Sequence, residues 1–109
     1  MQLHLPVARV GEIAPGSAKS FRFGVKNGIA FNDNGTIIAF ENFCTHSGGQ
    51  VDLHAASNQF VCRLHGACFD VKSGERLSGQ APENTRLKPI SLIEKDGMIL
   101  AILEINDGY

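Results

Sequence analysis

The chain has 109 residues, of which 43% are hydrophobic and 19% are charged. This length and composition predict one globular domain, residues 1–109, with a modest core. Ten basic and eleven acidic residues give a net charge of −1; they are spread along the chain, so we expect no nucleic-acid partner. No apolar run approaches the roughly 20 residues that a bilayer span needs. The first residues lack the pattern of a secretory signal, so we expect a cytoplasmic protein with no membrane partner.

Short apolar segments alternate with Gly, Asn, Asp and Ser, which is typical of strands and tight turns and predicts an all-β, antiparallel fold. In FRFGV, apolar side chains occupy every second position from Phe21 to Val25, as in a strand with one buried face. Residues 28–40 predict a hairpin, because Asn34-Gly35 accepts the positive φ angles of a primed two-residue turn.

The second half of the chain has similar signals. Residues 50–56 predict a turn, and Ser73-Gly74 predicts another between CFDVK and ERLSG. Residues 91–103 predict a closing hairpin with Asp96-Gly97 at its tip. No window has a helical stripe with caps, so we expect no substantial helix.

The region of about residues 42–82 differs in composition from the rest. It holds all three cysteines and three of the four histidines, and it is rich in Gly and Ser. An odd number of cysteines and a reducing cytosol favour thiols or metal ligands over disulfides. We therefore expect a small loop-rich subdomain, inserted into the β framework, that carries the functional site.

Two Cys-His pairs in this region predict an inorganic centre. Cys44 and His46 form C-x-H, Cys62 and His65 form C-x-x-H, and fifteen residues separate the two pairs. Each pair follows a strand-like run and lies in a loop flanked by glycine, an arrangement that chance alone explains poorly.

Two chemistries use two thiolates and two imidazoles. One is a structural zinc site, which would make the chain an interaction module, although C-x-H is tight for zinc ligands. The other is a Rieske [2Fe–2S] cluster, in which two His replace two Cys on one iron. A nucleophilic Cys-His site would leave the second pair unexplained.

The motifs CTH and CRLHG, the following ACFDVKSGERLSGQAP and the closing hairpin resemble the Rieske-type ferredoxins, the soluble carriers of bacterial multicomponent oxygenases. The resemblance runs from ARVGEIAPGS near the start to GMILAIL near the end. It implies an antiparallel β sandwich or barrel with a small cluster-binding subdomain and one [2Fe–2S] cluster per chain. Cys44 and Cys62 would bind the buried iron, and His46 and His65 the outer iron. SGQAP, ending at Pro82, occupies the place of the family's proline-containing loop over the cluster.

The resemblance also implies a one-electron carrier rather than an enzyme, with no catalytic residue and no small-molecule substrate of its own. Its partners would be an electron-donating reductase and an electron-accepting oxygenase or similar oxidoreductase. The alternative within the family is a Rieske small subunit of a larger reductase or oxidase, such as nitrite reductase. We expect the two ligand histidines to form the docking tip.

Side chains near the second pair predict a reduction potential at the low end of the Rieske range, which spans roughly −150 to +300 mV. High-potential members have a serine and a tyrosine where this chain has Ala67 and Phe69, neither of which donates a hydrogen bond. Arg63 stands where family members often have proline, and a cation there would raise the potential slightly or pair with an acidic partner. High-potential proteins also carry an extra cysteine in each ligand loop. Cys68 lies beyond the second loop with no such partner, so we expect a partly buried thiol.

The remaining candidates have ordinary explanations. We expect His4 and His54 at the surface. The seven phenylalanines are expected in the core, since no Lys/Arg stripe accompanies them as in a stacking platform. Four carboxylates flank the cluster region and are interpreted as solvated turn residues rather than docking groups: Asp52, Asp70, Glu75 and Glu83.

Overall fold

The computed structural model describes residues 1–42, 50–54, 56–63, 66–78 and 86–104, which contain strands and no helix. The all-β fold class is confirmed, and the described part of the chain has no helix long and apolar enough to cross a membrane. The strands are β1 Gln2–Arg9, β2 Ala18–Phe23, β3 Lys26–Asp33, β4 Thr36–Glu41, β5 Val51–His54, β6 Gln59–Cys62, β7 Cys68–Asp70, β8 Arg76–Ser78, β9 Pro89–Ile90, β10 Leu92–Lys95 and β11 Met98–Glu104.

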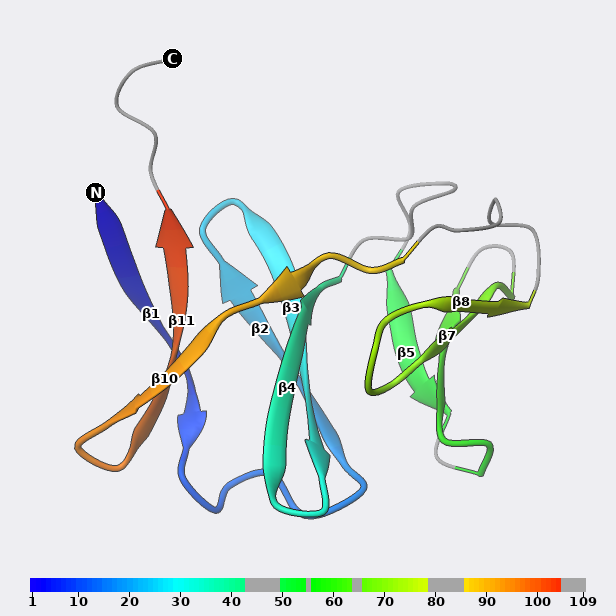
Figure 1. Cartoon of the computed structure of the whole chain (residues 1–109), viewed down its shortest axis with the longest axis horizontal. Helices are drawn as coiled ribbons and strands as arrows, with labels where there is room; N and C mark the ends of the chain where they lie inside the picture. The colour runs from blue at the N-terminus through cyan, green and yellow to red at the C-terminus, as the bar shows by residue number, and fades with distance from the viewer. Residues whose placement is uncertain (43–49, 55, 64–65, 79–85, 105–109) are drawn as a thin grey trace.

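The strands form three antiparallel sheets (Figure 1). The terminal sheet has the order β1-β11-β10, the central sheet β2-β3-β4-β9, and the insert sheet β5-β6-β7-β8. In the sequence the insert sheet comes between β4 and β9, two neighbouring strands of the central sheet. The loop-rich region thus leaves the framework from one strand and returns beside it.

The central sheet is covered on both faces, which explains why β3 is almost continuously buried. Successive strand side chains point to opposite faces, so Ile29 and Phe31 contact one core while Ala30 contacts the other. The insert core, between the central and insert sheets, contains Ile29, Phe31, Phe40, Val51, Phe60, Cys62, Ala67, Phe69, Val71 and Leu87. The terminal core, on the other face, contains Val7, Ala8, Ile13, Phe21, Phe23, Ala30, Ala39, Ile90, Ile99 and Ala101.

Aromatic packing joins the insert sheet to the central sheet. The Phe60 ring lies edge-on to Phe31 at 6.2 Å and to Phe40 at 6.1 Å between ring centroids. Such pairs contribute about 0.5–1.5 kcal/mol each beyond the area that they bury. Six of the seven phenylalanines are buried, as predicted; Phe43 lies outside the described residues.

The predicted turns at Asn34-Gly35, Asp96-Gly97 and Ser73-Gly74 are confirmed. Asn34 and Asp96 have φ angles of 51° and 52°, and each connects two antiparallel strands of a hairpin. Gly74 has a φ of 75° between β7 and β8.

Two predicted features are wrong. β2 ends at Phe23 and the chain turns at Gly24, so Val25 lies in the turn with 92% of its surface exposed. Residues 51–54 form β5 rather than a turn, because they pair with β6 in register from Val51↔Cys62 to His54↔Gln59. β1 was not predicted; Pro6 interrupts its pattern, and the register with β11 shifts between Pro6 and Ala8.

Candidate metal centre

The first ligand loop, residues 43–49, holds Cys44 and His46 and lies outside the described residues, but both of its ends are described. Asn42 precedes the loop and is buried. Its amide nitrogen donates to the Val51 carbonyl at 3.1 Å, and its amide oxygen accepts from the Val51 N–H at 2.6 Å. One side chain therefore satisfies both backbone groups of a fully buried residue and ties the two ends of the loop together.

Asn42 is a site-supporting residue that the sequence interpretation missed. Its own backbone N–H donates to Asn27 of β3 at 2.8 Å, which fixes it to the central sheet. The available signal was a polar residue that directly follows an apolar strand and precedes Cys44 by two positions.

The second ligand loop, residues 63–66, begins directly after Cys62, the last residue of β6. Cys62 is 2% exposed and belongs to the insert core. Its backbone N–H donates to the Ala67 carbonyl at 2.8 Å, and its carbonyl accepts from Gly66 at 3.0 Å. Gly66 has a φ of 70°, which lets the chain reverse over a short span. His65 lies in this loop, outside the described residues.

The bases of the two ligand loops lie side by side. Val51, just after the first loop, pairs with Cys62 across β5 and β6. The Arg63 N–H donates to the Gln50 carbonyl at 2.9 Å, which extends that pairing by one step toward the loops. Figure 1 shows the insert sheet, with β5 and the β7–β8 hairpin, on the side of the molecule away from the terminal sheet.

Of the four predicted ligands, the structure describes Cys62; Cys44, His46 and His65 lie outside the described residues. Within the described residues no group of three His, Cys, Asp or Glu side chains is placed to hold a metal ion. What the described residues contribute is a buried thiol and two adjacent loop bases.

An ion pair lies at these loop bases. Arg63 Nε donates to Asp52 Oδ2 at 2.7 Å, and Nη2 donates to Oδ1 at 2.8 Å, a bidentate geometry. Both side chains are exposed, at 54% and 57%. The hydrogen bonds from Arg63 lower the pKa of Asp52, and the same hydrogen bonds raise the pKa of Arg63. The sequence predicts that Arg63 raises the potential or pairs with an acidic partner. In the structure Arg63 pairs with a carboxylate of its own chain.

The two residues that predict a low reduction potential are buried in the same core as Cys62. Ala67 and Phe69 are both 0% exposed and pack in the insert core. Neither side chain has a hydroxyl to donate. Cys68, between them, is half-buried as expected, and its thiol donates to the Gly66 carbonyl at 3.4 Å.

The other sequence candidates are surface or turn residues. His4 and His54 are exposed, as predicted, and His54 Nδ1 lies 2.8 Å from Ser57 Oγ. Asp70 accepts hydrogen bonds from the Ser73 N–H and Oγ, so it stabilises the β7–β8 turn. Glu75 is exposed, and Glu83 lies outside the described residues.

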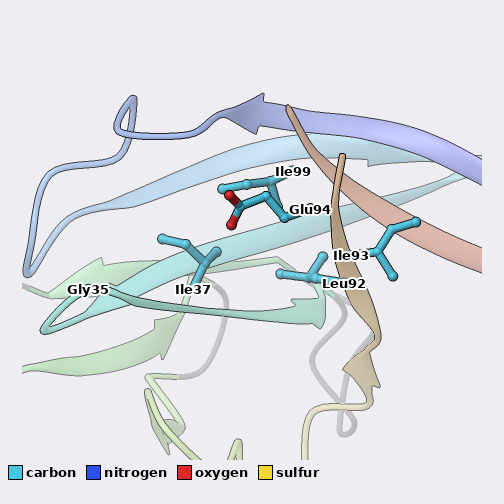
Figure 2. Close-up of a pocket in the computed structure, with 6 residues that line it drawn as sticks. All are labelled: Gly35, Ile37, Leu92, Ile93, Glu94 and Ile99. Atoms are coloured by element: carbon cyan, nitrogen blue, oxygen red, sulfur yellow. The ribbon is translucent and has the colours of Figure 1, made fainter. Parts of the chain in front are cut away.

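A shallow pocket of about 180 Å³ lies away from the loop bases, between β4 and the β10–β11 hairpin (Figure 2). Ile99, which lines it, belongs to the terminal core. Glu94 is its one charged lining residue and projects over an otherwise apolar wall. The pocket has no metal-ligand set and is separate from the centre predicted here. Its lining residues are Gly35, Ile37, Leu92, Ile93, Glu94 and Ile99.

Comparison with known proteins indicates the same class of protein as the two Cys-His motifs do. The model of the Rieske [2Fe–2S] domain matches residues 4–102. The chain is 35% identical, over 98 residues, to the cytochrome b6-f complex iron-sulfur subunit of Chlorobaculum thiosulfatiphilum, covering 89% of this chain and 52% of that protein. The corresponding subunit of Chlorobaculum tepidum is 29% identical, with 51% of it covered. The chain therefore spans about half the length of these curated relatives.

Solved structures share the fold. A cyanobacterial plasma membrane Rieske protein from Synechocystis superposes with a TM-score of 0.76 and 25% identity, covering 89% of this chain and 97% of that one. The ferredoxin of carbazole 1,9a-dioxygenase from Nocardioides aromaticivorans superposes with a TM-score of 0.72, covering 90% and 95% of the two chains. At 22% identity the second likeness establishes the fold alone.

The fold and the matched domain define an iron–sulfur protein. The chain belongs to the Rieske [2Fe–2S] family and carries one Rieske cluster.

Proposed function

We propose that Cys44, His46, Cys62 and His65 hold the cluster, with the two cysteines on the buried iron and the two histidines on the outer iron. The observation that carries this proposal is the pairing of Val51 with Cys62, because it brings the bases of both Cys-His loops together. The burial of Cys62 suits a thiolate on the inner iron. Two sulfur and two nitrogen donors are the Rieske ligand set.

The chemistry that the bound cluster supplies is reversible uptake of one electron, at a potential raised by two neutral imidazoles in place of two thiolates. The chain's own residues prepare the site. The rings of Phe60 and Phe69 exclude water from the side of Cys62, and Asn42 holds the first ligand loop closed. His46 and His65, at the surface in this proposal, present ring edges to a docking partner.

We infer that the chain works as a single Rieske domain, residues 1–109, with a cluster-binding subdomain at about residues 42–82. It takes electrons from a reductase and delivers them to a terminal oxygenase or similar oxidoreductase. The shared fold with the ferredoxin of a carbazole dioxygenase supports this choice of partner. Ala67 and Phe69, which offer no hydroxyl, support a low potential for the carrier. The cytoplasmic location stays a prediction from the sequence.

A second candidate is a Rieske subunit of a larger electron-transfer complex. The 35% identity to a cytochrome b6-f iron-sulfur subunit favours it. Against it, the first ligand motif CTHSGG lacks the additional cysteine that high-potential respiratory Rieske proteins carry. Purification of the native protein separates the two candidates: a subunit co-purifies in a stable complex, whereas a shuttle is recovered free of its partners.

The test of the ligand set is spectroscopy on anaerobically purified protein, oxidised and then reduced with dithionite. We expect a red-brown protein whose reduced form has an average g value below that of all-cysteine clusters. Cys44→Ser and Cys62→Ser should abolish this signal, whereas Cys68→Ser, the matched control, should keep it. A colourless protein that binds stoichiometric zinc would instead establish the structural zinc module.

A further inference from the structure

The Asp52–Arg63 pair is the ion pair that joins the two loop bases in the described part of the chain. Arg63 is the first residue of the second ligand loop, and its backbone is bonded to Gln50, the residue that directly follows the first loop. Asp52 lies two residues further along β5. The two charges are therefore connected through one short stretch of paired backbone to both loops.

We propose that Asp52 is a positioning residue that holds the Arg63 guanidinium at the loop bases, and that its carboxylate cancels the upward shift in reduction potential that the unpaired Arg63 charge would cause. This inference rests on the proposed function, because it concerns a centre between the two loops. It goes beyond that function by assigning a role to two residues that are not ligands.

The geometry restrains a side chain that would otherwise be mobile. An arginine side chain has many rotamers, and an exposed one spends much of its time in water. Two hydrogen bonds of 2.7 and 2.8 Å to the two oxygens of one carboxylate fix the guanidinium plane. Lysine could not reproduce this geometry, because its ammonium is a point charge rather than a planar fork.

The two charges shift the reduction potential in opposite directions. An unpaired guanidinium beside the centre stabilises an added electron and raises the potential, whereas an unpaired carboxylate lowers it. With the two charges 2.7 Å apart, their fields largely cancel at larger distances. The pair contributes little to folding, since it is exposed. What sets it apart from an ordinary surface ion pair is that each charge, if its partner were removed, would shift the reduction potential.

The experiment is a charge cycle read out as reduction potential. Asp52→Asn, Arg63→Gln and the double variant are each loaded with the cluster and titrated spectroelectrochemically at low and high salt. We expect Asp52→Asn to shift the potential upward and Arg63→Gln to shift it downward. The double variant should lie between them, close to wild type. Both single shifts should shrink at high salt, because exposed charges are screened.

The chain offers a matched control in the Glu12–Lys19 pair. Its Nζ–Oε2 distance is 2.6 Å, and its side chains are 40% and 38% exposed. It joins β2 to the β1–β2 connection, on the framework rather than the insert sheet (Figure 1). Glu12→Gln and Lys19→Gln should leave the potential unchanged.

Two results overturn the inference while the proposed function stands: single variants that keep the wild-type potential, or single variants that both shift it in one direction. A shift in one direction would mean that the pair only maintains loop structure. A wild-type protein without a one-electron couple would overturn the proposed function, and this inference with it.

Discussion

Asn42 is a buried polar side chain at the described base of the first ligand loop. Its amide makes two hydrogen bonds to Val51, which is 0% exposed. Asn42→Ala leaves a buried N–H and a buried carbonyl without that partner, which costs about 2–4 kcal/mol of unfolding free energy. Because those bonds also close the first ligand loop, we expect faster loss of the cluster. Urea unfolding and the decay of cluster absorbance with a chelator measure the two effects.

Asn32 supplies the matched control for that substitution. It is also buried, and its amide bonds the Ile13 carbonyl at 2.7 Å and the Gly35 N–H at 2.6 Å, in the framework rather than at a ligand loop. Asn32→Ala should lower stability by a similar amount and leave the rate of cluster loss near that of wild type. Equal acceleration in both variants would mean that global stability alone controls cluster retention.

Ala67 is the residue at which the low potential can be tested most directly. A serine hydroxyl there could donate to sulfur, as in high-potential members of the family. A hydrogen bond to a charged group is worth about 1.5–3 kcal/mol, and a tenfold change in a one-electron equilibrium is 59 mV, so the upward shift is expected to reach at most roughly 130 mV. Redox titration of Ala67→Ser, beside a wild type expected below zero, measures it.

Ala101→Ser is the control for Ala67→Ser. Ala101 is equally buried, at 0% exposure, but it packs in the terminal core on the far face of the central sheet. Its substitution buries a hydroxyl at a comparable cost and should leave the potential unchanged. A wild-type potential above zero would contradict the reasoning from Ala67 and Phe69.

At the scale of single elements, the β7–β8 turn depends on Gly74. Its φ is +75°, and a Cβ atom there would lie 2.7 Å from Phe40 Cε1 and 3.1 Å from the Leu87 carbonyl oxygen. Gly74→Ala therefore adds a clash to the cost of left-handed backbone, and we expect a loss of roughly 2–4 kcal/mol. Thermal or urea unfolding measures this loss.

A substitution at Gly97 measures the cost of the left-handed backbone without the steric clash. Its φ is +80°, and a Cβ there would meet nothing within 4 Å. Gly97→Ala should lose only the conformational part, about 1–2 kcal/mol. Similar losses in the two variants would show that the Phe40 ring moves aside at little cost.

The elements that the sequence predicted correctly are those whose signal is local. Asn34-Gly35 and Asp96-Gly97 define their turns through backbone preference alone. β5 was predicted as a turn because its four residues become a strand only by pairing with β6. β1 was missed because Pro6 breaks its alternation.

The same distinction, between local signals and contacts of residues far apart in the sequence, applies to the site. The spacing within each Cys-His pair is a local property, and so the candidate ligands could be named from the sequence. The clamp between Asn42 and Val51 spans nine residues, and the pair between Asp52 and Arg63 spans eleven. The Asp52–Arg63 pair depends on the register of β5 with β6, and the Asn42–Val51 clamp depends on the start of β5 lying beside the end of β4. No local pattern in the sequence contains either relation.

At the scale of the whole molecule, two cores share one sheet, and Cys62, the predicted ligand among the described residues, lies in one of them. Cys62 packs in the insert core, whereas the terminal core is formed by the two framework sheets. The strands of the insert sheet have three or four residues each, so they have few ladder bonds of their own. Metal ligation couples to folding, and in this molecule that coupling should be confined to one half.

We therefore expect cluster removal to loosen the insert sheet selectively. Hydrogen exchange followed by mass spectrometry, on the loaded protein and on Cys62→Ser, should show lost protection in peptides from β5 to β8. Peptides from β1 and β11, whose pairing runs from Gln2↔Glu104 to Arg9↔Met98, should keep theirs. Cys68→Ser, which leaves the proposed ligands intact, should match the loaded wild type. Equal loss in β11 would mean that the two cores unfold as one unit, with the central sheet transmitting the loss of the cluster to the framework.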